Sequence, residues 1–267
     1  MSTRRLSSAP RAWLPLVTGW LSVGCMLAVW EWAGRSGDSA LAVILPPPSQ
    51  FLRAIAQSDF KVGLGSQAES IYASVLSTFA RVFAGMALAF VAAVLTGALL
   101  SLSRVATWSL GPILRLLAPI APIAWIPTAI VVFGIGNTTA VFIVFMGVYF
   151  ILTIATLAEI ERVPREFLTV AGNLGANAPQ RWLWVVLPAI LPGVFTLLRT
   201  NFIAAWMAVL VAEMVGLRDG LGAIIMMGRN LFNNDLIMFG MVVIGLSGFL
   251  VDKLLGFIAR YVLWWRV

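Results

Sequence analysis

Long apolar stretches separated by short polar ones dominate the chain. The apolar runs lie at about residues 13–34, 71–101, 108–133, 138–158, 189–216 and 236–258. Each run is long enough to cross the hydrocarbon core of a bilayer, about 30 Å thick, as a helix. The pattern therefore predicts an all-α fold, a polytopic transmembrane helix bundle of about six spans.

The third apolar run is interrupted by proline. It contains Pro112, Pro119, Pro122 and Pro127. Proline removes a backbone donor and bends or breaks a helix, and a broken helix at membrane depth is tolerated where protein or a cavity surrounds it. The run is thus predicted to be a broken span, in which the prolines either shape packing or border a path.

The polar segment 163–188, between the fourth and fifth runs, carries the signals of a short helix and a turn. Pro164 suits the first position of a helix. Apolar residues then follow at i, i+3, i+4 and i+7, namely Phe167, Val170, Ala171 and Leu174. Gly175 comes directly after them, where a glycine commonly ends a helix in the left-handed conformation.

A second helix is predicted to begin at once. Asn177 can cap it, and Pro179 lies in its opening turn. Gln180 lies three residues after Asn177, the spacing of a capping box. Pro188 is expected to end this helix, so the segment is predicted to be a narrow helical hairpin.

Basic residues indicate the orientation of the bundle, because cytoplasmic loops of membrane proteins carry an excess of Lys and Arg. If the first span enters from the cytoplasm, the inner segments hold Arg4, Arg5, Arg11, Arg104, Arg162, Arg165, Arg181, Arg260 and Arg266. The outer segments, although longer, hold only Arg35, Arg53, Lys61, Arg218 and Arg229. The bias predicts that both termini and the hairpin are cytoplasmic.

The expected organisation follows from these segments. Residues 1–34 are an N-terminal tail and first transmembrane helix, residues 35–70 an outer-face loop, and residues 261–267 a C-terminal tail. Residues 71–260 form the core, with the cytoplasmic hairpin at 159–188 and an outer loop at 217–236. The basic N-terminus could also begin a signal peptide cleaved near residues 40–42, but the first apolar run is longer than a typical signal sequence.

Composition places the chain in the membrane and excludes several kinds of site. Hydrophobic residues make up 61% and charged residues 11%, and the mean hydropathy is +0.97, far from the values of soluble domains. Cys25 is the only cysteine and there is no histidine, so no internal disulfide can form and no metal site is expected. The net charge of +7 is spread singly rather than in a patch, so no nucleic-acid partner is expected.

The chain also has no recognisable site for ATP. No stretch reads G-x4-G-K-[ST], and the only lysines are Lys61 and Lys253. It is therefore not expected to be an enzyme, and the missing histidine and the absence of paired catalytic groups in the spans disfavour an intramembrane enzyme. ATP and Mg²⁺, if the protein uses them, would belong to a partner subunit, and no cofactor is expected in this chain.

Ionisable residues within the spans are candidates for a translocation path, because charge is costly in hydrocarbon. Four qualify: Arg81, Arg115, Arg199 and Glu213. Their excess of positive charge would favour anions. Each could instead have a structural role, pairing with other charges or with backbone carbonyls.

The hairpin resembles the coupling loop, or "EAA" motif, of importer-type ABC transporter permeases. Ala171, Gly175, Leu187 and Pro188 follow the spacing A-x3-G-x9-V-x-L-P. Thr169 stands where the family pattern begins with Glu, and the nearby acid, Glu166, lies three positions earlier. The coupling-loop residues that the resemblance implies are Glu166, Thr169, Ala171, Gly175, Ala176, Leu187 and Pro188.

Two further phrases, LPPPSQ at 45–50 and PIAPIAWIP at 119–127, resemble the permease subfamily for nitrate, sulfonates and taurine. The resemblance implies a transmembrane subunit of an ATP-binding cassette importer in a bacterial inner membrane, surrounded by lipid. It implies a path for a small anion or organic solute, delivered by an external or periplasmic binding protein. It also implies a separate ATP-binding subunit on the hairpin and a second copy of the permease, as a homodimer.

The main alternative is a stand-alone, ion-coupled secondary transporter of a small anion. Such a protein would need carboxylates or polar clusters at mid-depth, and the spans contain few. Co-purification with an ATP-binding partner would distinguish the two classes.

Overall fold

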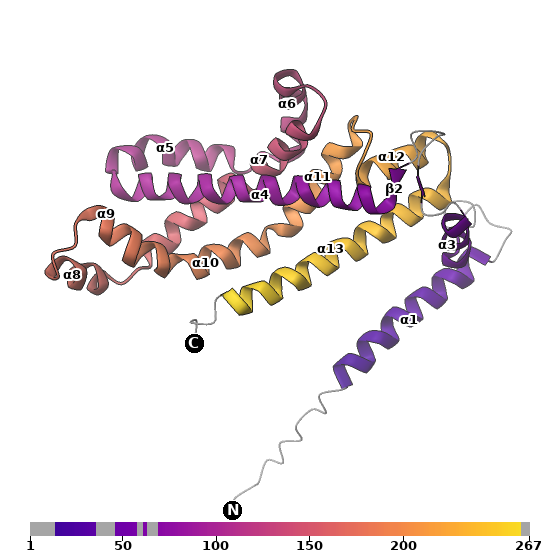
Figure 1. Ribbon diagram of the computed structural model, residues 1–267, viewed down its shortest axis with the longest axis horizontal. Coiled ribbons are helices and arrows are strands. Elements are labelled where there is room, and N and C mark those ends of the chain that lie inside the picture. The colour runs from indigo at the N-terminus through magenta and orange to yellow at the C-terminus, as the bar shows by residue number, and fades with distance from the viewer. Residues whose placement is uncertain (1–13, 36–45, 58–60, 63–68, 263–267) are drawn as a thin grey trace, which may run out of the picture. The chain divides into compact units, whose positions relative to one another are not determined.

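The computed structural model describes residues 14–35, 46–57, 61–62 and 69–262. The helices begin with α1 (Leu14–Arg35), α3 (Pro48–Gln57), α4 (Ile71–Leu102), α5 (Arg104–Leu117), the 3-10 helix η2 (Pro122–Trp125) and α6 (Ile126–Phe133). They continue with α7 (Asn137–Glu161), α8 (Arg165–Asn173), α9 (Ala178–Arg181), the π-helical segment η3 (Trp182–Val186), α10 (Leu187–Thr200), α11 (Phe202–Met214), α12 (Leu221–Asn230) and α13 (Asn234–Val262). Among the described residues the only strands are β1 (Lys61–Val62) and β2 (Glu69–Ser70), an antiparallel pair. The helical fold class is confirmed (Figure 1).

Fewer helices than predicted are long and apolar enough to cross a membrane. In the part of the chain that the structure describes there are four, or five if the bent pair formed by α5 and residues 122–133 is one span. The first predicted span is a helix, α1, but it is not one of the four. The cleavage site of the alternative interpretation as a signal peptide, at residues 40–42, lies outside the described residues.

The chain divides into two compact units. The smaller contains α1, α3 and residues 228–239. Within it, the backbone N–H and hydroxyl of Ser49 both donate to the carboxylate of Glu31, at 3.1 Å and 2.5 Å. Glu31 also pairs with Arg35 at 2.7 Å, and Phe51 is buried with its ring 5.8 Å from that of Trp30. These contacts hold α3 against the end of α1.

The larger unit, residues 61–227 and 240–267, is organised around the crossing of α4 and α7 (Figure 1). Small residues at every fourth position of α4 face α7: Gly85, Ala89, Ala93 and Gly97, the two alanines being fully buried. A Cβ atom at Gly85 would lie 2.6 Å from Cβ of Val144, and one at Gly97 would lie 2.9 Å from Cγ2 of Thr156. Small residues at this spacing let two helix backbones approach closely, which gives dispersion contacts that do not depend on water.

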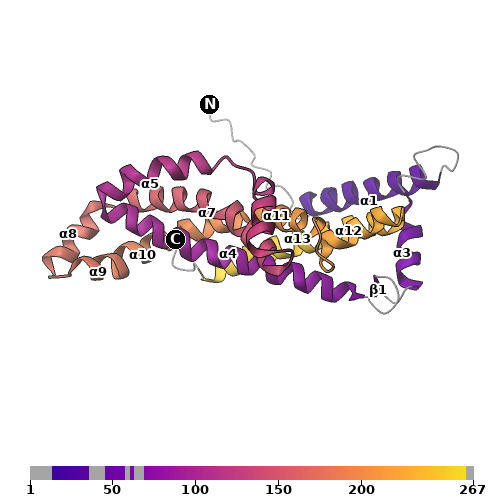
Figure 2. The ribbon, with the colours of Figure 1, turned by 90° about the horizontal axis from the view of Figure 1, so that it is seen from above.

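The predicted break in the third run is confirmed. The axes of α5 and of the helical segment 122–133 differ by 100°, and Figure 1 shows α6 turned away from α5. Ala121, just before Pro122, is extended, with ψ of 139°, as expected because proline disfavours the helical conformation in the residue before it. Helix α5 itself turns back at Ser103, which is extended, and lies alongside α4 and α7 (Figure 2).

The prediction of one helix over residues 189–216 was wrong, because α10 ends and α11 begins at Asn201. The Asn201 side-chain amide donates to the carbonyl of Leu197 at 2.8 Å, and the Asn201 backbone N–H donates to the same carbonyl at 2.9 Å. An asparagine that bonds its own helix in this way competes with the regular ladder and favours a helix end.

The outer loop predicted at 217–236 is partly helical, which corrects that assignment. Helix α12 lies within it, and Leu221, Ala223 and Ile224 are buried. A glycine is required at 222, because a Cβ there would overlap the carbonyl oxygen of Leu210 on α11. Burial of this apolar patch is the reason that the segment is ordered as a helix.

Candidate functional site

The predicted hairpin is formed by α8 and α9, and its turn is built on Gly175. Gly175 has φ of +82°, a region that residues with a side chain rarely adopt. The N–H of Ala176 donates to the carbonyl of Ala171, and the N–H of Gly175 donates to that of Gly172, both at 3.0 Å. These two bonds form a Schellman motif. The spacing of Ala171 and Gly175 is thus the spacing that this helix end requires.

The predicted capping box at the start of α9 is confirmed. The Asn177 side chain accepts from the backbone N–H of Gln180, and the Gln180 side chain accepts from the N–H of Asn177, both at 2.9 Å. Both bonds satisfy donors that a helix start leaves unpaired. The hairpin turn is therefore closed from both sides by backbone and side-chain hydrogen bonds.

The expected end of the second helix at Pro188 was wrong. The backbone continues from α9 through a π-helical turn, η3, into α10, and residues Ala178–Thr200 form one apolar segment of 23 residues. Leu187 N–H donates to the carbonyl of Trp182, five residues earlier. The wider π turn absorbs the missing N–H and the ring of Pro188, which would otherwise break the ladder. The second arm of the hairpin is consequently continuous with a candidate membrane span.

The exposed face of α8 presents an apolar stripe. Phe167, Val170 and Leu174 are 54%, 57% and 82% exposed. Glu166 lies in the first turn of α8, where its charge complements the helix dipole. Thr169 is exposed, but its hydroxyl donates to the carbonyl of Arg165 at 3.0 Å, within its own helix.

Arg181 and Trp182 are residues of the hairpin that sequence patterns did not single out. Nη1 of Arg181 would lie 3.9 Å from a Cβ atom at Gly172, so the guanidinium reaches across to α8. Nε of Arg181 and the indole nitrogen of Trp182 are buried without a hydrogen-bond partner among the described residues. A contact across a turn leaves no local signal in the sequence.

Two of the four predicted path residues, Arg81 and Glu213, form an ion pair. Nη1 of Arg81 lies 2.7 Å from the Glu213 carboxylate, and the two side chains are 3% and 0% exposed. Nη2 of Arg81 also lies 2.6 Å from the carboxylate of Asp219, which is 33% exposed. We call these three residues the outer charge cluster.

Neutral groups complete the outer charge cluster. The hydroxyl of Thr78 donates to Glu213 at 2.8 Å, and the N–H of Gly222 donates to it at 2.9 Å. Nε of Arg81 donates to the side-chain oxygen of Asn137 at 2.8 Å, and Nη1 donates to the backbone carbonyl of Asp219 at 3.1 Å. The cluster thus joins α4, the start of α7, the end of α11 and the loop before α12.

Arg199, on α10, is not part of the outer charge cluster. It is half-buried and lies 3.5 Å from Asp252 on α13. A Cβ atom at Gly256 would lie 2.7 Å from its Nη2, so the guanidinium lies directly against the α13 backbone. These contacts give Arg199 a role in joining α10 to α13.

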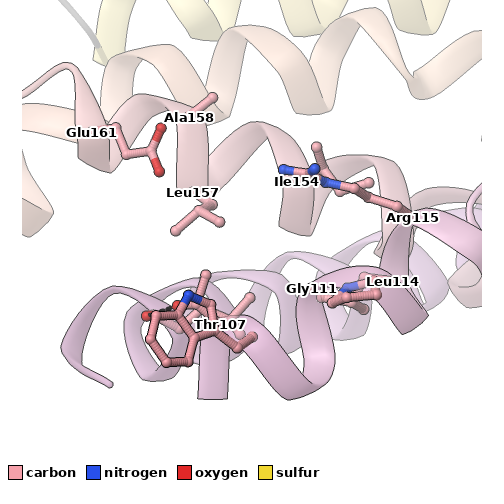
Figure 3. Close-up of a pocket in the computed structure, with 11 residues that line it drawn as sticks. Thr107, Gly111, Leu114, Arg115, Ile154, Leu157, Ala158 and Glu161 are labelled. Atoms are coloured by element: carbon pink, nitrogen blue, oxygen red, sulfur yellow. Dashed lines mark hydrogen bonds between the residues drawn. The ribbon is translucent and has the colours of Figure 1, made fainter. Parts of the chain in front are cut away.

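Arg115, the fourth candidate, lines a cavity of about 410 Å³ between α5 and α7 (Figure 3). From α5 the lining includes Thr107, Trp108 and Gly111, and from α7 it includes Ile154 and Glu161. In the described part of the chain, Arg115 takes part in none of the ion pairs or hydrogen bonds. Among the described residues, no group of His, Cys, Asp and Glu is arranged to hold a metal ion.

Comparison with known proteins agrees with this architecture. Residues 85–263 match the model of the family described as "Binding-protein-dependent transport system inner membrane component". The taurine transport system permease protein of Escherichia coli is 26% identical over 87% of this chain and 84% of its own. A nitrate import permease protein of Leptolyngbya laminosa is 28% identical over 73% of this chain and 70% of its own. An inward-facing structure of the MetNI methionine ABC transporter shares the fold, with a TM-score of 0.59 and 23% identity over 71% of this chain and 94% of that chain.

Proposed function

Because this chain belongs to the family of binding-protein-dependent transport system inner membrane components and is the transmembrane subunit of an ABC importer, we propose that a separate ATP-binding subunit docks on the hairpin α8–α9. ATP and Mg²⁺ bind that partner. An external or periplasmic binding protein delivers the cargo on the other side. The family assignment replaces the stand-alone secondary transporter as an interpretation of the sequence.

The observation that carries the docking proposal is the exposed apolar stripe on a hairpin whose turn is held rigid. Phe167, Val170 and Leu174 face outward although each is a large apolar side chain, and such patches favour a protein partner. The Schellman turn and the capping box hold the hairpin in one conformation, which lowers the entropy lost on binding.

The hairpin is also mechanically suited to coupling. Its first arm follows directly on α7, and its second arm runs without a break into α10 through the π turn. Force applied to the hairpin by closure of the ATP-binding subunits would therefore move α7 and α10 together. Gly175 allows the turn that joins the two arms. The coupling-loop residues proposed are Glu166, Thr169, Ala171, Gly175, Ala176, Leu187 and Pro188.

We propose a small oxyanion or a solute that bears one as the cargo. The relatives named above transport taurine, which carries a sulfonate, and nitrate. Of the predicted path residues Arg81, Arg115, Arg199 and Glu213, Arg115 remains the strongest candidate, because it lines a cavity and has no ion-pair partner among the described residues. Two copies of the chain would form the path, since each offers one hairpin and ABC ATPases act in pairs.

Co-purification tests the docking proposal. Tagged chain is expressed with the ATP-binding subunit encoded beside it, and the stoichiometry of the complex is measured in mild detergent. Leu174→Asp, which places a charge in the apolar stripe, should weaken the complex about tenfold or more, because burial of one leucine contributes about 1.5–3 kcal/mol.

Asn173→Asp is the matched control, because it adds the same charge one residue away on an exposed side chain outside the apolar stripe. It should leave the stoichiometry unchanged. A complex that tolerates Leu174→Asp and Asn173→Asp equally would argue against the stripe as the docking surface.

A further inference from the structure

The cavity between α5 and α7 has a charged residue at each end. The two helices run antiparallel beside it, since Arg104 at the start of α5 and Glu161 at the end of α7 line the same neighbouring hollow. That hollow shares Thr107, Trp108 and Glu161 with the cavity. Together they form one recess, with Glu161 at the end next to the hairpin.

Arg115 lies at the opposite end of the recess. It comes eleven residues after Arg104 on α5, a rise of about 16 Å, and Figure 3 shows its side chain extending toward Ile154 of α7. Ile154 precedes Glu161 by seven residues, or about 10 Å. Arg115, whose side chain is exposed, therefore borders the recess well away from its end at the hairpin.

The surroundings of Arg115 leave its charge uncompensated. Leu114, Ile154 and Leu157 give the recess apolar walls, and a Cβ atom at Gly111 would meet no heavy atom within 4 Å. The hydroxyl of Thr107 is already engaged, since it donates to the carbonyl of Leu100 at 2.6 Å. Among the described residues, the exposed Arg115 guanidinium takes part in none of the ion pairs or hydrogen bonds, so it is available to bind an anion.

We propose that Arg115 binds a single oxyanion group, of the nitrate, sulfonate or carboxylate class, at the end of this recess away from the hairpin. The planar guanidinium matches two oxygens of such a group. Glu161, at the other end, repels the same anion and opposes prolonged occupancy. This inference rests on the proposed function for the direction of movement: Glu161 lies at the end of the recess next to the hairpin, and an anion released toward that end leaves on the side of the ATP-binding subunit.

The test measures electrostatic potential in the recess without requiring transport. The full-length chain, with Cys25→Ser to remove its only cysteine, carries Ile154→Cys and is reconstituted in lipid nanodiscs. The rates of thiol modification by an anionic and a cationic methanethiosulfonate reagent of similar size are then compared. A unit charge about 8 Å away at an effective dielectric constant of about 40 changes the local concentration of each reagent about fivefold, in opposite directions.

Arg115→Gln should therefore lower the ratio of anionic to cationic rates about 25-fold, while Arg115→Lys should keep most of it. Sodium nitrate, and separately taurine, should slow modification when Arg115 is present and have no effect in Arg115→Gln. Arg218→Gln, on the loop before α12, is the control and should leave the ratio unchanged. Protection by nitrate but not by taurine would assign the site to inorganic oxyanions.

Two outcomes overturn the proposal: a ratio that does not respond to Arg115→Gln, or protection that persists in that variant. Failure of the proposed function is distinguishable from either. Loss of the ATP-binding partner in co-purification, with the charge-selective reactivity at position 154 intact, would refute the importer mechanism and leave the anion site standing.

Discussion

The outer charge cluster makes a quantitative prediction about stability. Arg81→Met removes the cation and leaves Glu213, which is fully buried, with only Thr78 and Gly222 as donors. Removing one partner of a buried ion pair costs about 3–5 kcal/mol, because the other charge stays desolvated. Since those two donors remain and Asp219 is partly exposed to solvent, we expect the lower end of that range, about 3 kcal/mol.

The other two members of the cluster should cost less. Glu213→Gln leaves Arg81 paired with Asp219, so a cost of about 1.5–3 kcal/mol is expected for the lost charge-assisted hydrogen bonds. Asp219→Asn affects a partly exposed carboxylate and leaves the Arg81–Glu213 pair intact, so we expect about 1 kcal/mol or less. The predicted order of destabilisation is therefore Arg81→Met, then Glu213→Gln, then Asp219→Asn.

Thermal unfolding of the purified variants in one detergent, followed by tryptophan fluorescence, measures this order. At about 2–4 °C per kcal/mol for a chain of this size, Arg81→Met should lower the Tm by about 6–12 °C. The double variant Arg81→Met, Glu213→Leu should recover part of the loss, because it replaces both charges with apolar groups. Equal Tm values for all three single variants would refute the view that the cluster is a buried, mutually compensating network.

Two further predictions concern the helix crossing and the hairpin. Gly85→Leu should lower the Tm by at least several degrees, because even a Cβ atom there would lie 2.6 Å from Cβ of Val144. Gly245→Leu is the control, since a Cβ atom at Gly245 would meet no atom within 4 Å. Equal effects of the two substitutions on the Tm would contradict tight packing of α4 on α7. Asn177→Ala should cost about 1 kcal/mol of hairpin stability and reduce co-purification of the ATP-binding subunit. Asn177→Ser, which keeps a capping side chain, should restore both. An unaffected complex in Asn177→Ala would show that the capping box does not contribute to docking.

Features specified by neighbouring residues could be predicted from the sequence. The turn at Gly175 and the capping box at Asn177 were predicted correctly, since each depends on residues within one or two helical turns. The break near Pro119 and Pro122 was predicted for the same reason. These signals are local, and the physical cause lies in the backbone itself.

Features that depend on packing were missed. Pro188 is a strong local stop signal, yet the π turn before it allows the helix to continue into a candidate membrane span. Asn201 is a weak signal, yet it divides a helix that hydropathy alone presents as continuous. The pairing of Arg81 with Asp219 joins residues far apart in the chain, so no spacing rule could have found it. The ionisable residues of the spans could be listed from the sequence, but their ion-pair partners could not.

Docking of the ATP-binding subunit on the hairpin is tested most directly by a site-specific cross-link from the hairpin in the assembled complex. A photoreactive phenylalanine analogue is placed at position 174, or at position 131 on α6, where Val131 is 86% exposed, and cross-linked partners are identified by mass spectrometry. If the ATP-binding subunit docks on the hairpin, it should cross-link from position 174 and not from position 131. A complex whose ATP-binding subunit cross-links from position 131 and not from position 174 would contradict the docking of that subunit on the hairpin.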